Sequence, residues 1–183
     1  MVFSAGCFTE SPDGSFESSA RADDAAKCLA PEDAARLADQ VLQYVNLERV
    51  AEGLPPVVMN STLEDIAGDY ACRMVDEGFF DHRDPGTGAG PAQRALDGEY
   101  LFYAIGENLA AGQQTPVEVM NVWMESDAHR GIILDPKWEE IGIAVRTGGA
   151  YAVYWVQEFG QPAEEEGEVE TADEPASLDA ELP

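Results

Sequence analysis

The sequence predicts an α+β fold in which helices come first and a β-hairpin comes last. Apolar residues recur at helical spacing within residues 31–53, 61–75 and 116–130. Residues 141–159 instead contain two β-branched and aromatic runs separated by Gly148 and Gly149. Because the strands follow the helices rather than alternate with them, we expect helices layered on an antiparallel hairpin and not a parallel sheet.

Start signals support the first two helices. Pro31 is followed by Glu32 and Asp33, which suits a helix opening because acidic side chains face the positive end of the helix dipole. This helix is expected to stop at Gly53. The second helix follows the capping residues Asn60 and Ser61, and the segment S-T-L-E at 61–64 has the form of a capping box.

The middle of the chain is expected to be irregular before a third helix. Residues 78–100 contain Gly and Pro throughout, with one short helical piece at residues 92–96. A single helix is then predicted from Pro116 to about Arg130, with Gly131 as its C-cap. We therefore assign one domain to residues 31–160.

Both ends of the chain lack the apolar residues that a fold needs. Residues 1–30 form a predicted flexible arm, and residues 161–183 form a predicted disordered tail with nine acidic residues and no basic one. The first residues resemble the remnant of an export or lipoprotein signal, because small residues precede Cys7, although the basic and long apolar regions of a signal are missing. We expect an extracytoplasmic protein, secreted or lipid-anchored.

The charge of the chain excludes some partners. The formal net charge is -26, and a surface of that sign repels phosphate backbones and anionic head groups. Nucleic acid and acidic membranes are therefore excluded as partners. The sequence also lacks the roughly 18 to 20 consecutive apolar residues of a spanning helix, so no transmembrane segment is predicted, and we expect a monomer.

Cysteine usage leaves two interpretations open. The chain has three cysteines, too few for a disulfide scaffold, and their spacing matches no zinc pattern. Cys28 and Cys72 could pair and tie the arm to the second helix. Alternatively, Cys72 is a small buried apolar residue.

Candidate chemistry centres on the only two histidines, His82 and His129. Between them, Glu107 lies in an otherwise apolar segment, and a buried carboxylate needs a hydrogen-bond donor, a cation or a raised pKa. Two His and a Glu are ligand types that zinc accepts, whereas a structural His–Glu network needs no metal. Ser126 and His129 could also act as a nucleophile and base, but no oxyanion loop accompanies them.

Seven segments taken in order resemble the bacterial branch of the CAP superfamily, the SCP-like extracellular domains. They cover nearly all of residues 31–160 and read V-N-L-E-R before G-L-P-P at 45–56, F-F-D-H at 79–82, Arg94, G-E-N-L-A at 106–110, W-M-E-S-D-A-H-R at 123–130, I-G-I-A-V at 141–145 and Y-W-V-Q at 154–157. The resemblance implies an α-β-α sandwich with a central antiparallel sheet.

The same resemblance implies a cleft with His and Glu side chains. Many eukaryotic members hold two His and two Glu around a cleft that takes a divalent cation such as zinc or magnesium, and His82 and Glu107 match the first His and one Glu. Ser126 stands where those members carry the second Glu, and their second His lies in a segment absent here. The cleft candidates are His82, Glu107, His129, Ser126, Glu125, Asn108 and Arg94, of which His82, His129 and Glu107 are the candidate metal ligands.

Two functions follow from these expectations. By family analogy, the domain is a binding module for an apolar ligand or a cell-envelope component, since similar proteins are associated with lipid or sterol binding and with protein interactions in secretion. The alternative is a divalent-cation-dependent hydrolase or peptidase that uses the same cleft. The sequence does not decide whether the protein is an enzyme.

Overall fold

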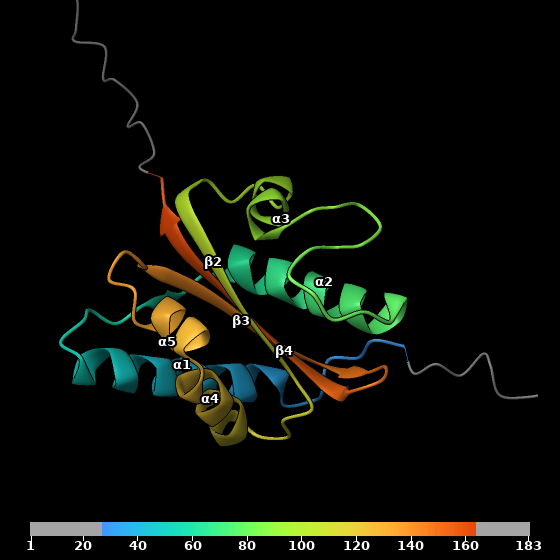
Figure 1. Ribbon diagram of the computed structural model, residues 1–183, viewed down its shortest axis with the longest axis horizontal. Helices are drawn as coiled ribbons and strands as arrows, with labels where there is room; N and C mark the ends of the chain where they lie inside the picture. The colour runs from blue at the N-terminus through green and yellow to red at the C-terminus, as the bar shows by residue number, and fades with distance from the viewer. Residues whose placement is uncertain (1–26, 164–183) are drawn as a thin grey trace, which may run out of the picture.

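A four-stranded sheet separates two layers of helices (Figure 1). The computed structural model describes residues 27–163, so the predictions for residues 1–26 and 164–183 lie outside the described part. The helices are α1 (Ala34–Ala51), α2 (Ser61–Glu77), α3 (Pro91–Asp97), α4 (Pro116–Glu125) and α5 (Asp127–Ile133). The strands are β1 (Val58–Met59), β2 (Phe102–Ala111), β3 (Glu140–Gly148) and β4 (Ala152–Pro162).

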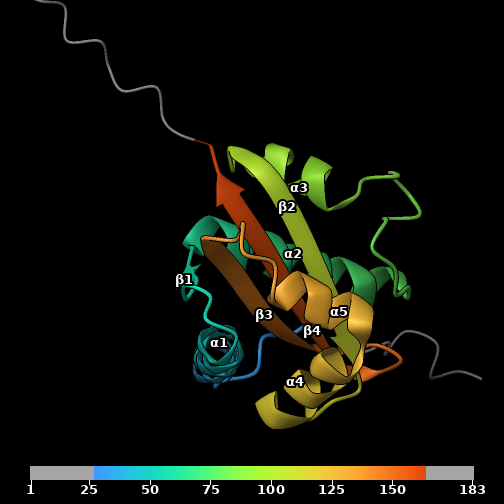
Figure 2. The same cartoon turned by 60° about the vertical axis from the view of Figure 1, so that its left-hand side comes forward.

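The strand order is β1-β3-β4-β2, which makes β2 an edge strand. Strands β3, β4 and β2 pair antiparallel as expected, whereas the short β1 pairs parallel with β3. Helices α2 and α3 lie on one face of the sheet, and α1, α4 and α5 lie on the other (Figure 2). The α-β-α sandwich and the α+β class are therefore confirmed.

Helix α2 begins and ends where its capping chemistry allows. It is capped by Asn60, whose side-chain oxygen accepts a hydrogen bond from the backbone N–H of Leu63 at 3.1 Å. Ser61 is the first helical residue rather than the cap. The helix ends at Gly78, whose φ of 71° is left-handed and costs glycine little.

The single helix predicted for residues 116–130 is wrong. Ser126 has extended backbone angles, φ -94° and ψ 120°, and divides the segment into α4 and α5. Gly131 lies inside α5 and is not its C-cap. No Gly or Pro occurs at or beside Ser126, so only the backbone geometry reveals the break.

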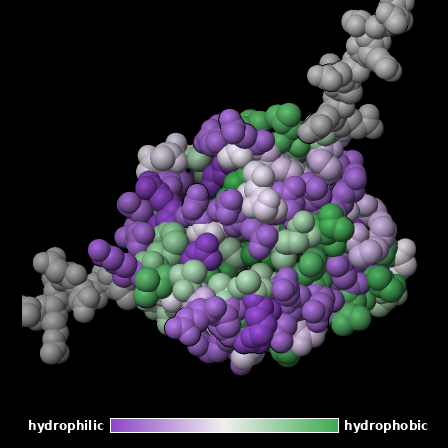
Figure 3. All heavy atoms as spheres, turned by 180° about the vertical axis from the view of Figure 1, so that it is seen from behind, coloured by the Kyte–Doolittle hydropathy of each residue, from purple (hydrophilic) through white to green (hydrophobic). Residues whose placement is uncertain are grey.

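Two hydrophobic clusters fill the space between the layers. One joins α1 and α4 to the face of the sheet that they cover, and it contains Trp123, Trp138, Trp155 and Phe159. The other joins α2 to the opposite face through Tyr70, Met74, Tyr154 and Val156. The sheet is thus covered on both faces, while hydrophilic and hydrophobic side chains are interspersed on the outer surface seen from behind (Figure 3).

A buried arginine fastens α1 to the segment between α5 and β3. Arg49 is fully buried, and its guanidinium donates to four backbone carbonyl oxygens, those of Pro55, Ile133, Asp135 and Trp138 at 2.8–3.1 Å. These bonds satisfy a buried cation without a carboxylate at hydrogen-bonding distance. They hold the α5–β3 connection beside the end of α1.

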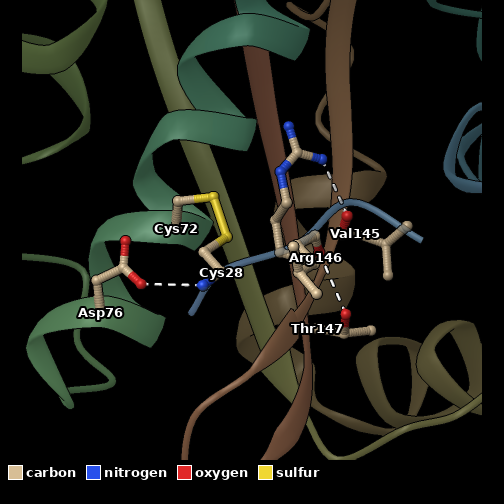
Figure 4. Close-up of a disulfide and its surroundings, with 7 residues drawn as sticks. Cys28, Cys72, Asp76, Val145, Arg146 and Thr147 are labelled. Carbon is tan, nitrogen blue, oxygen red and sulfur yellow. Dashed lines mark hydrogen bonds between the residues drawn. A yellow bond between two sulfur atoms is a disulfide. The ribbon is translucent and has the colours of Figure 1, made fainter. Parts of the chain in front are cut away.

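Of the two interpretations of the cysteines, the disulfide is confirmed. Cys28 and Cys72 form a disulfide that ties the chain before α1 to α2 (Figure 4). The backbone N–H of Cys28 also donates to Asp76, at 2.9 Å. Leu29 then forms a β-bridge with Thr147 of β3. The last residues of the N-terminal arm therefore belong to the folded unit.

Candidate functional site

Glu107 and Glu158 lie side by side near the middle of β2 and β4, and they set the chemistry of the face that α2 and α3 cover. The two residues are direct partners across the strands, and each side chain is only 1% exposed. The prediction that Glu107 is buried is confirmed. Glu158 was not among the predicted cleft residues, although it interrupts an apolar strand in the same way as Glu107.

Arg94 of α3 is the cation that lies against both carboxylates. Its guanidinium contacts Glu107 directly and reaches Glu158 at 3.4 Å. The same group stacks on the ring of Tyr70, 3.3 Å from the ring centroid, which keeps it in a desolvated position. Arg94 also donates to the carbonyl oxygens of His82 and Ala89, so it fixes the loop above the carboxylates.

Two adjacent carboxylates with one guanidinium leave an excess negative charge. Burial raises the pKa of Glu158 well above its ordinary range, and the charge of Glu107 raises it further, while Arg94 opposes the change. The Oε2 atom of Glu158 is buried without a hydrogen-bond partner. The pKa of Glu158 therefore lies above that of an ordinary glutamate, and Glu158 is more readily protonated than an exposed carboxylate.

His82 lies at the solvent-exposed side of the network. Its Nδ1 lies 2.7 Å from Oε1 of Glu107, and its side chain is 54% exposed. The hydrogen bond to Glu107 raises the pKa of His82, with burial opposing it. The exposed imidazole of His82, in the loop that follows α2, therefore contacts a buried carboxylate.

His129 and Asn108 belong to the opposite face of the sheet. Asn108 is fully buried and donates to Gln157 on β4 at 3.2 Å and to the carbonyl of His129 on α5 at 3.3 Å. The Nδ1 atom of His129 is buried without a partner. Burial lowers the pKa of His129, and the charge of His82 lowers it further, so the two rings are electrostatic neighbours although no hydrogen bond joins them.

The remaining candidates do not reach the network. Glu125 is the last residue of α4 and is exposed. Ser126 lies at the helix break, and within residues 27–163 its side chain makes no hydrogen bond to His129 or to the start of α5. The interpretation of Ser126 and His129 as a nucleophile and base therefore lacks the contact it requires.

Residues 42–159 match the model of the Cysteine-rich secretory protein family, CAP. The chain belongs to this family. It is 34% identical over 130 residues to the uncharacterized protein YkwD of Bacillus subtilis, covering 71% of this chain and 49% of the relative. It is 24% identical over 106 residues to the uncharacterized membrane protein YlbC of the same organism, covering 58% of this chain and 30% of that protein. The chain therefore spans about half or less of the length of these relatives.

Solved structures of bacterial proteins support the fold. An extracellular protein with an SCP domain from Bacillus anthracis has a TM-score of 0.64 at 25% identity, covering 73% of this chain and 44% of that one. An outer surface protein of Borrelia burgdorferi has a TM-score of 0.63 at 22% identity, covering 68% of this chain and 92% of that one. Among the helices within residues 27–163, none combines the length and apolar character that crossing a membrane requires.

The donor set of this family member does not fit the expected metal site. Within residues 27–163, no group of three or more His, Cys, Asp or Glu side chains is arranged so that it could hold a metal ion. One oxygen of Glu107 contacts His82 and the other contacts Arg94, whose positive charge would repel a cation. The residues at hand instead form a hydrogen-bonded charge network that includes His82, Glu107, Glu158 and Arg94.

Proposed function

We propose that this CAP domain is an extracytoplasmic binding module that holds an apolar small molecule, or the apolar part of a cell-envelope component, in a groove between α1 and α4. The observation that carries the proposal is a cavity of about 490 Å³ beside these helices. Cavities of about 300–1,000 Å³ are typical of small-molecule sites.

The lining of the groove matches an apolar ligand with a polar end. The groove is lined by residues of β3 and β4, of α1 and of the start of α4. Its apolar lining residues include Leu37, Tyr44, Val117, Val145, Val153 and Trp155. Polar residues, among them Arg36, Gln40 and Gln114, share the lining. Contact with the apolar lining favours binding by about 25 cal/mol per Å² buried, and the polar residues can orient a head group.

A steric block tests this site. Val117→Trp places a large ring in the groove, and it should weaken binding of a pyrene-labelled long-chain fatty acid at least tenfold, or by about 1.4 kcal/mol. Val122→Trp is the matched control, because Val122 is on the same helix, is 41% exposed and does not line the groove. Equal affinity of both variants and wild type would remove the groove as the binding site.

A second candidate function, the alternative to the binding module, is hydrolysis at His82. The observation that favours it is an exposed imidazole oriented by a buried carboxylate, an arrangement that suits a general base. Turnover of chromogenic ester or peptide substrates, with and without added zinc or magnesium, compares the two functions. Activity lost in His82→Gln would favour hydrolysis, whereas fatty-acid binding without turnover favours the binding module.

A further inference from the structure

Residues 27–31 form a strap that leads from α2 to the start of α1. The strap is attached at Cys28, through the disulfide to Cys72 and the hydrogen bond to Asp76. It is attached again at Leu29, whose N–H and C=O both bond to the backbone of Thr147, at 3.0 and 2.8 Å. Figure 4 shows the disulfide beside Arg146 and Thr147 of β3.

The strap is also a wall of the proposed groove. Pro31, its last residue, lines the cavity together with Thr147, the residue that Leu29 pairs with. The same β-bridge that holds the strap therefore fixes two lining residues. Displacement of the strap would open this side of the groove to solvent.

The disulfide is the strongest attachment of the strap. The side chain of Leu29 is 64% exposed and Ala30 is exposed, so neither anchors the strap by burial. Each remaining hydrogen bond contributes only a small net free energy. Their sum is roughly cancelled by the conformational entropy that is lost when five residues are ordered. Cys28 and Cys72 are half-buried, so a thiolate from solvent can reach the disulfide.

We infer that the Cys28–Cys72 disulfide is a redox latch on the groove: the oxidised strap closes one side of the cavity, and reduction releases the strap and opens it. The reductant is a dithiol. Its two S–H groups become a disulfide as the Cys28–Cys72 bond breaks, and the two electrons and two protons pass to the cysteine sulfurs. The regulatory role of the disulfide rests on the proposed function of the groove. Release of the strap on reduction does not depend on that function.

Amide hydrogen exchange measures release of the strap without any ligand. In the oxidised protein the N–H groups of Leu29 and Thr147 should be protected, since each donates to the other residue. Treatment with a dithiol should speed their exchange at least tenfold and leave exchange in α2 unchanged. Unchanged protection of Leu29 after complete reduction would overturn the latch.

Dissociation of the pyrene-labelled fatty acid measures gating. Reduction should raise its dissociation rate at least fivefold in wild type and should have no effect in Cys72→Ser, which is already fast. Leu29→Pro removes the N–H that bonds to Thr147 but keeps both cysteines, so the oxidised variant should dissociate as slowly as oxidised wild type, and fast dissociation of it would show that the β-bridge and not the disulfide holds the strap. Leu29→Ala retains that bond and should behave as wild type.

The outcomes separate the two proposals. A released strap with an unchanged dissociation rate overturns the gating role and leaves the groove as the binding site. If the probe binds neither redox form, the groove is not the site and gating falls with it, while exchange at Leu29 still decides whether the disulfide holds the strap.

Discussion

The two faces of the sheet use neighbouring residues of the same strands for opposite purposes. Glu107 and Glu158 point toward α2 and α3, where their charges are matched by Arg94 and His82. Asn108 and Gln157, one position away on each strand, bond to each other on the side of α1 and α4. Strand alternation thus places the ionisable side chains of these strands on one face of the sheet and their uncharged neighbours on the other.

The two faces differ in the free energy that a bound ligand could gain. On the charged face, the oxygens of Glu107 are already bonded within the protein, so a ligand would have to replace strong internal contacts. On the opposite face, the groove between α1 and α4 presents apolar surface to solvent. The charged face is therefore expected to contribute mainly to stability, and the other face to binding.

The largest expected effect comes from removing the cation of the charged face. Arg94→Ala leaves Glu107 charged and buried beside Glu158, and breaking a buried ion pair in this way costs about 3–5 kcal/mol. Arg83→Ala is the control, because Arg83 is exposed and should change the unfolding free energy by less than about 0.5 kcal/mol. Denaturant unfolding that shows equal stability of the two variants would contradict the charged network.

Substitution of Glu107 should lower the free energy of unfolding by a smaller amount, which depends on how many hydrogen bonds the new side chain can keep. Glu107→Ala loses the bonds to His82 and Arg94 and should destabilise by about 1–3 kcal/mol, whereas Glu107→Gln keeps some bonds and should lose less. Thermal unfolding is measured with and without added zinc or magnesium. A structural role predicts no response to metal, and a metal-dependent gain of wild-type stability, lost in both variants, would indicate ligation instead.

The sequence supports the fold better than the site. Capping at Asn60 and the apolar stripe of α2 are local signals, and the final hairpin follows from composition. Strand β2 was not predicted, because Glu107 and Asn108 interrupt its apolar pattern and each is satisfied only by distant residues. The break at Ser126 was missed for a related reason, since no Gly or Pro marks it.

Two members of the site could be predicted from the sequence. The rarity of histidine and the apolar surroundings of Glu107 identified His82 and Glu107, the family resemblance matched both, and the two side chains are in contact. Glu158 was missed, although a Glu within an apolar strand is the same signal that identified Glu107. His129 was grouped with His82; its backbone carbonyl accepts a bond from Asn108, and whether the two histidines share one ligand stays a prediction.

Glu158→Gln should change the pH dependence of stability more than stability itself. The folded-state pKa of Glu158 is raised by burial and by Glu107, so its favourable contribution is complete below the ordinary carboxyl pKa and is lost as pH rises through the raised value. Wild type should therefore lose stability with rising pH relative to Glu158→Gln, which cannot ionise. Unfolding free energies from about pH 4 to about pH 9 measure the difference; parallel profiles would mean that Glu158 ionises normally.

The smallest expected effect is on the pH dependence of stability, which should have opposite signs for the two histidines. The pKa of His82 is raised by its bond to Glu107, so its contribution to stability is complete below about 6.5 and is lost as pH rises through the raised pKa. The pKa of His129 is lowered by burial, so its contribution is present above about 6.5 and is lost as pH falls through the lowered pKa. The stability difference between wild type and His82→Gln should therefore shrink with rising pH, and the difference for His129→Gln should grow.

Nuclear magnetic resonance adds a test of whether the rings sense one another. Because the charge of His82 contributes to the lowered pKa of His129, His82→Gln should move the titration of the His129 ring upward, toward the ordinary histidine value. His82→Lys keeps a positive charge and should leave that titration low. If His129 titrates identically in wild type and both variants, the two faces are electrostatically independent, and a cleft that joins His82 to His129 is ruled out.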